Sequence, residues 1–159
     1  MKKRGKTDLI EKLLKKEIFP EKALEILQEE QGQNLYEYST DWFSPHIPIW
    51  TKIFEKHGFL DPKKTLKCLE IGSWEGRSSV FILKNLCQSK KSTLFCLDTF
   101  RGSIEHTQRE HNKKLFSMFC YNMFASGQED QVQILKGFSR NSLRFLLTKI
   151  TKRLLILHI

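Results

Sequence analysis

The chain has 159 residues, of which 40% are hydrophobic and 28% charged, and its formal net charge is +9. This length and composition fit one ordinary soluble globular domain and leave little room for a second. No apolar run approaches the length of a membrane span, and the basic start at residues 1–6 lacks the apolar segment of a secretion signal. The four cysteines are widely spaced without a C-x-x-C pair, so we expect no zinc site and a reduced, cytoplasmic protein.

The positive charge raises the question of a nucleic-acid partner. Seven Lys and Arg residues lie within the first sixteen positions, against only Asp8 and Glu11. Later lysines are scattered as on a solvated surface, and aromatic residues do not alternate with them as they do on single-strand binding surfaces. The sequence therefore disfavours nucleic acid as a partner, and RNA stays open as a substrate.

Two short amphipathic helices are predicted within residues 7–30, with a break at Pro20. We assign residues 1–40 to an N-terminal helical extension. Such helices either cover the body of the domain or bind a partner, and the pattern does not choose between these roles.

The next helix is predicted to begin with Ser44 as its capping residue and Pro45 in its first position, and to end at His57-Gly58. The neighbouring aromatic residues are interpreted as packing rather than as a ligand site. The predicted apolar face consists of Ile49, Trp50, Ile53 and Phe54, and the other aromatic residues are Trp42 and Phe43.

Strands and helices alternate from residue 65 onward. Apolar strand patterns lie at residues 67–71, 93–98, 132–135 and 153–159, and helical patterns separate them at 76–87, 115–123 and 141–150. Such alternation indicates a parallel sheet with right-handed crossovers, so we assign residues 41–159 to an α/β, Rossmann-like domain. The last strand is apolar on both faces, and we expect an exposed edge there that pairs with a second copy or another partner.

The most informative segment joins the first of these strands to the following helix and reads Leu69-Glu70-Ile71-Gly72-Ser73-Trp74-Glu75-Gly76. Glycine in such a turn lets the backbone approach a ligand closely, and the amides at a helix N-terminus attract negative groups. The dinucleotide fingerprint would require glycine at Trp74 and Arg77, and no Gly-Lys-Ser/Thr ending of a P-loop is present. What remains is an acid two positions before one glycine, with a second glycine four positions later.

This E-x-G-x-x-x-G pattern resembles motif I of class I S-adenosylmethionine-dependent methyltransferases, E/D-x-G-x-G-x-G, with Trp74 at the middle glycine. Asp98 ends the next strand, where an acid of that family binds the ribose hydroxyls. Further segments are similar to a small-molecule and sugar-modifying branch of the family. The resemblance covers roughly residues 41–150 and implies the N-terminal half of the class I fold, S-adenosyl-L-methionine as cofactor, and a small-molecule or sugar acceptor.

The resemblance also implies a cofactor cradle. The two glycines and the serine between them would line the methionine moiety, the first acid would lie near its amino group, Asp98 would hold the ribose, and the serine after the third strand would border the adenine. The six residues are Glu70, Gly72, Ser73, Gly76, Asp98 and Ser139.

Structural roles compete with these functional ones. Ser73 could be a helix cap and Asp98 a former of the turn after its strand. We assign purely structural roles to three further residues: Trp74 is predicted to pack, Arg77 to be a surface charge and His106 to be an ordinary loop histidine.

In the family, the fourth strand runs into an acidic segment resembling D-x-I-x-I-D-G-S-H, which often supplies acceptor-binding, metal-binding or catalytic groups. Residues 151–159 contain no acid, so we assign no catalytic residue and no metal ligand and expect a truncated or frameshifted chain. Three functions follow from the sequence: an active methyltransferase, a non-catalytic fragment that binds the cofactor weakly or not at all, and a basic adaptor for protein or RNA.

Overall fold

The computed structural model describes residues 35–102, 109–140, 143–144, 146 and 154–158. Four strands form one sheet in the order β3-β2-β1-β4, and every neighbouring pair is parallel. The strands are β1 (Lys67–Ile71), β2 (Thr93–Asp98), β3 (Val132–Lys136) and β4 (Leu155–His158). This topology confirms the predicted Rossmann-like partial fold, with β4 beside β1 as the doubly wound order requires.

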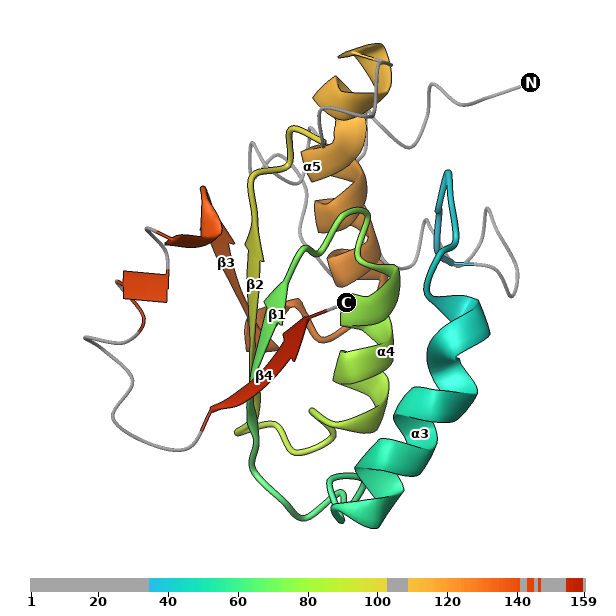
Figure 1. The fold of residues 1–159 in the computed structure, drawn as a ribbon, viewed down its shortest axis with the longest axis vertical. Coiled ribbons are helices and arrows are strands. Elements are labelled where there is room, and N and C mark those ends of the chain that lie inside the picture. The colour runs from blue at the N-terminus through green and yellow to red at the C-terminus, as the bar shows by residue number, and fades with distance from the viewer. Residues whose placement is uncertain (1–34, 103–108, 141–142, 145, 147–153, 159) are drawn as a thin grey trace.

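The helices labelled in Figure 1 gather on one face of the sheet, and the helical segment after β3 lies on the other. Helix α4 (Arg77–Asn85) joins β1 to β2, and α5 (Arg109–Ala125), followed by a short 3-10 helix η2 (Glu129–Gln131), leads into β3. Helix α3 (Ile47–Lys56) precedes β1. Within the described residues, no helix combines the length and the apolar character that crossing a membrane demands.

Some predicted elements fall wholly or partly outside the described residues. The two helices predicted within residues 7–30 lie outside them. After β3, residues 139–140, 143–144 and 146 are helical. The helix predicted at 141–150 therefore begins earlier, at Ser139, and its remaining positions are not described.

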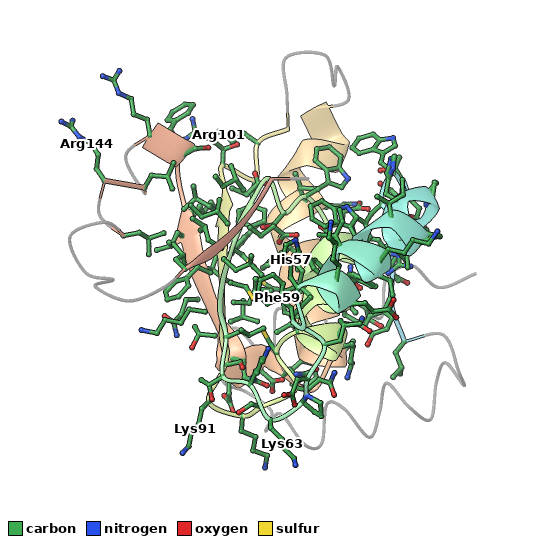
Figure 2. The ribbon with its side chains drawn as sticks, turned by 60° about the horizontal axis from the view of Figure 1, so that its bottom comes forward. His57, Phe59, Lys63, Lys91, Arg101 and Arg144 are labelled. Carbon is green, nitrogen blue, oxygen red and sulfur yellow. The ribbon has the colours of Figure 1, made fainter. Side chains whose placement is uncertain are left out.

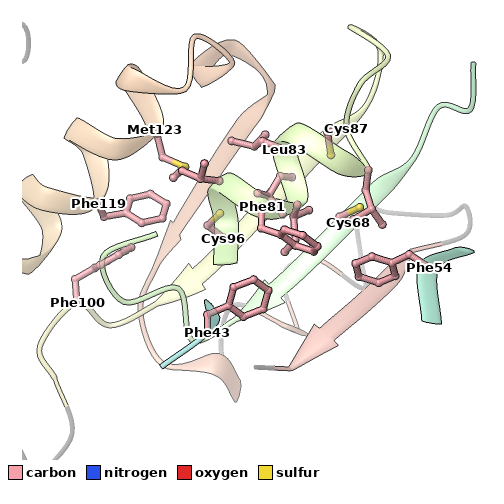
Figure 3. Close-up of a cluster of buried hydrophobic side chains, with 14 of the residues drawn as sticks. Phe43, Phe54, Cys68, Phe81, Leu83, Cys87, Cys96, Phe100, Phe119 and Met123 are labelled. Atoms are coloured by element: carbon pink, nitrogen blue, oxygen red, sulfur yellow. The ribbon is translucent and has the colours of Figure 1, made fainter. Parts of the chain in front are cut away.

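The main core lies between the sheet and the helices (Figure 3). Rings from α3, from α4 and from the segment before α3 follow one another in it: the Phe43 and Phe81 centroids are 5.2 Å apart, and those of Phe54 and Phe81 are 6.2 Å apart. Cys68 and Cys96 are completely buried beside them, as predicted for small apolar residues of strands. A smaller cluster on the other face of the sheet is centred on Leu69, Leu97 and Leu146.

The start of α3 differs from the prediction. A 3-10 turn, η1 (Ser44–His46), comes first, and the α-helix begins only at Ile47. Ser44 makes no capping bond; instead, Asp41 Oδ1 accepts the amides of Phe43 at 3.2 Å and Ser44 at 2.8 Å. An aspartate three residues earlier thus replaces the predicted serine cap, and the hydroxyl of Ser44 becomes free to bind elsewhere.

The buried face of α3 is also narrower than predicted. Phe54 is 2% exposed and Trp50 packs against the core, but Ile49 and Ile53 are 60% and 42% exposed. The end of the helix is confirmed, because His57 is its C-terminal cap and Gly58 follows with φ +65°. The ring of His57 stacks on that of Phe59 with 5.8 Å between centroids (Figure 2).

Candidate functional site

The carboxyl ends of β1, β2 and β3 meet at one edge of the sheet. The amide of Gly72 donates to the carbonyl of Leu97 at 2.9 Å, and the amide of Gly137 donates to the carbonyl of Asp98 at 2.9 Å. Figure 2 shows Arg101 beyond this end of β2, with Lys63 and Lys91 at the opposite end of the molecule. The loops that carry the predicted site residues are therefore adjacent, as expected for ligand sites of parallel sheets.

Asp98 links two of these loops through its carboxylate. Oδ2 accepts the amide of Trp74 at 2.9 Å, and Oδ1 accepts the amide of Phe100 at 2.7 Å. The second bond is the side-chain turn predicted for a strand-end aspartate. The first joins Asp98 to the glycine loop (residues 72–76). Each carboxylate oxygen has a second acceptor position, so the group can still accept hydroxyl protons from a ligand.

The two amide donors share an unusual backbone. Trp74 has φ +48° and Phe100 has φ +52°, and they are the described non-glycine residues with positive φ. Glycine takes this conformation without the clash that a Cβ produces, which explains why motif I usually carries glycine at the position of Trp74. Asp98 therefore holds two strained residues in place through charge-assisted hydrogen bonds.

Glu70 lies beneath the glycine loop rather than on its surface. It is completely buried, and its oxygens accept the hydroxyls of Ser78, at 2.5 Å, and Ser79. Burial raises the pKa of Glu70, and the hydroxyls that donate to it oppose the rise. In this position Glu70 fixes the first turn of α4 against β1, and its predicted contact with the methionine amino group stays a prediction.

Gly76 is required by packing. It has φ +85°, and a Cβ built on it would lie 2.7 Å from Met123 Cε and 3.1 Å from Phe119 Cδ2. Gly76 is also the N-terminal cap of α4, and no described side chain bonds to the amides of the first turn. The alternative prediction that Ser73 caps this helix is therefore wrong. The hydroxyl of Ser73 is buried and has no hydrogen-bond partner among the described residues.

Gly72 and Ser139 are exposed at the same edge of the sheet. Gly72 has φ +86°, which keeps its backbone open to an approaching ligand. Ser139 follows the Gly137 turn that is bonded to β2. Phe138, which lies between Gly137 and Ser139, is 66% exposed, and the family often has an acid at this position.

A segment before α3 packs against the glycine loop, and we call residues 36–44 the strap. Trp74 Nε1 donates to Thr40 Oγ1 at 3.2 Å, and the Trp74 ring lies 5.3 Å from that of Trp42, which confirms its packing role. The prediction that Arg77 is only a surface charge is wrong. Its guanidinium donates to Ser44 Oγ at 2.6 and 3.1 Å and lies 3.6 Å from Asp41.

Two further residues complete this arrangement, and sequence reasoning missed both. Asn122 of α5 is completely buried and bonds to Glu37 and to the carbonyl of Glu75. Glu75 Oε2 in turn accepts the amide of Ser39 at 2.7 Å. The available signal was an asparagine within an apolar helical face, since a buried amide needs partners.

The residues present fit a nucleoside cofactor with a carboxylate and an amine at one end. The glycine loop offers exposed backbone at Gly72, a buried hydroxyl without a partner at Ser73, and a neighbouring carboxylate at Asp98. Within the described part of the chain, His, Cys, Asp and Glu side chains form no group of three that could hold a metal ion.

Comparison with known proteins identifies the family of the chain. No curated protein sequence matches the chain. The model of a family described as a methyltransferase domain matches residues 69–159, which is more than half of the chain and includes the end of β1, the glycine loop, Asp98 and strands β2 to β4. The chain therefore belongs to this methyltransferase domain family.

Proposed function

We propose that the chain binds S-adenosyl-L-methionine across the glycine loop and Asp98, and that it serves methyl transfer to a small-molecule or sugar acceptor. The observation that carries the proposal is the 2.9 Å bond between Asp98 and the amide of Trp74. It joins the group suited to ribose hydroxyls and the loop suited to an amino-acid moiety into one unit.

Each residue of the unit has a defined task in this proposal. The backbone at Gly72 and the hydroxyl of Ser73 face the methionine moiety, Asp98 accepts the ribose hydroxyls, and Ser139 borders the adenine. Glu70 and Gly76 support the loop from below through the contacts with α4 and α5 described above. When bound, the cofactor supplies an electrophilic methyl group on a sulfonium.

Methyl transfer depends mainly on holding the acceptor in line with that methyl group. The residues of this chain contribute by fixing the cofactor, since two loops tied by one carboxylate leave the site little freedom to reorganise. The acceptor is named here only by class, small molecule or sugar, and no described residue is assigned to it.

Calorimetric titration with S-adenosylmethionine and S-adenosylhomocysteine tests the cofactor part. We expect binding by the unmutated chain and a loss of affinity of about ten- to a hundredfold in Asp98→Asn, because a charge-assisted hydrogen bond contributes about 1.5–3 kcal/mol. Asp130→Asn, an exposed acid of η2, is the matched control and should bind normally. No heat with the unmutated chain would end the proposal.

Formation of S-adenosylhomocysteine in the presence of pooled phenols, catechols and sugars tests the transfer part. Binding without product from any acceptor would support the non-catalytic alternative.

A further inference from the structure

We propose that Asn122 is a positioning residue for the glycine loop. Its hydrogen bonds hold the strap against this loop, in what we call the clamped form, and so keep the loop in the shape that binds the cofactor; the inference rests on the function proposed above. Asn122 lies on α5, outside the loop and outside the conserved pattern of motif I. It acts through Glu75 and the strap.

The bonds of Asn122 use its whole side-chain amide. Oδ1 accepts the amide of Glu37 at 2.9 Å, and Nδ2 donates to the carbonyls of Glu37 at 2.7 Å and Glu75 at 2.8 Å. One completely buried side chain thus pairs with the backbone of the strap in both directions and with the backbone of the glycine loop. Only an amide can offer the acceptor and both donors at once.

Two residues of the glycine loop, and the first residue of α4 directly after it, bond to the strap. Trp74 bonds to Thr40, Glu75 to Ser39 and Arg77 to Ser44. Because the amide of Trp74 also reaches Asp98, displacement of the strap would release the residue that connects the two halves of the site.

One hydroxyl of the strap and one of the glycine loop are buried without a hydrogen-bond partner in the described part of the chain. Ser73 Oγ and Tyr38 Oη are both buried, and neither has a hydrogen-bond partner among the described residues. The ring of Tyr38 lies over the Arg77 guanidinium at 5.6 Å. A buried hydroxyl without a partner is costly unless a ligand or water meets it, so Ser73, which belongs to the glycine loop, carries a polar group that a ligand at the loop would satisfy.

Clamping and binding are then linked. A cofactor that binds only the clamped form has its apparent affinity reduced by the fraction of molecules in that form. Loss of the clamp should therefore weaken binding and, without any ligand, make the strap and the loop exchange their amide protons faster.

The test compares Asn122→Ala with Ser126→Ala in the full chain. Ser126 follows the same helix and makes a buried local bond to the carbonyl of Met123 at 2.5 Å without contacting the strap. Ser39→Pro is a second test variant: it removes the amide that Glu75 accepts and leaves the core intact, so it stays informative if Asn122→Ala does not fold.

Hydrogen exchange of the ligand-free variants and their affinity for S-adenosylhomocysteine are both measured. We expect Asn122→Ala and Ser39→Pro to raise exchange in residues 36–44 and 72–77 and to weaken binding by about tenfold or more, with Ser126→Ala within about twofold of the unmutated chain. Unchanged exchange in the loop, or unchanged affinity despite faster exchange, would overturn the inference. Failure of the unmutated chain to bind would overturn the proposed function and this positioning role together, and faster loop exchange would then show a purely structural clamp.

Discussion

The strained backbone of Trp74 allows a test in which a glycine variant should be more stable than an alanine variant, the reverse of their usual order of stability. Alanine is normally more stabilising than glycine, by about 0.5–1 kcal/mol, because glycine loses more backbone freedom on folding. At φ +48° the order should reverse, since a left-handed conformation costs a residue with a Cβ about 1–2 kcal/mol. Taking the middle of both ranges, Trp74→Gly should be more stable than Trp74→Ala by about 0.7 kcal/mol.

The design isolates the backbone. Both variants lose the ring contact with Trp42 and the bond to Thr40, so these losses cancel in the comparison. Urea unfolding followed by far-ultraviolet circular dichroism measures the difference without relying on the removed tryptophan. At Lys52, an exposed position within α3, the same pair should follow the usual order, with alanine better by about 1 kcal/mol. If Trp74→Ala were at least as stable as Trp74→Gly, Asp98 would not be holding a strained turn, and the account of the two linked loops would be wrong.

Three further predictions concern the support of the site and the edge of the sheet. Because burial raises the pKa of Glu70 above its usual 4.5, the folded chain holds a proton over a pH range in which the unfolded chain has lost it, so stability falls as pH rises through that range. The melting temperature of Glu70→Gln relative to the unmutated chain should accordingly rise between about pH 4 and pH 7, and a constant difference would contradict the burial of a titrating group. Gly76→Ala should cost about 2–3 kcal/mol, against about 1 kcal/mol for Gly127→Ala, which has positive φ but no atom within 4 Å of its Cβ; equal losses in urea unfolding would show that Met123 gives way freely. Finally, we propose that β4, which ends the described sheet, pairs with a second copy of the chain through its free backbone edge. A charge on an edge strand opposes such pairing, so replacing the 57% exposed Ile156 in Ile156→Lys should lower the mass that light scattering measures at high protein concentration, and an unchanged mass would reject this edge as the interface between copies.

The fold could be predicted because each element carries its own local signal. The strand patterns ended at Gly72 and Asp98 in the sequence, and parallel pairing then brings those ends together without further information. The alternation of strands and helices implied this geometry, and the family motif then indicated which cofactor it would bind.

The support of the site could not be predicted because its contacts join distant parts of the chain. Ser44 and Arg77 are 33 positions apart, and each has an ordinary local explanation, as a cap and as a surface charge. Both explanations are wrong, because Asp41 accepts the amide that Ser44 was expected to cap and Arg77 contacts the strap. Likewise, the apolar stripe on α3 gave no indication that Ile49 and Ile53 would stay exposed, since periodicity reports which residues share a face and not how much of it is covered.

The long reach of Asn122 has a consequence for how the protein is made. Glu37 and Glu75 precede it by 85 and 47 positions, so both leave the ribosome well before the side chain that joins them exists. Until α5 has been synthesised and docked, the nascent chain has the glycine loop and Asp98 but not the side chain that holds the strap on that loop. Assembly of the site therefore belongs to a late stage of folding, and a chain interrupted before α5 would contain the glycine-loop motif without the side chain that joins this loop to the strap.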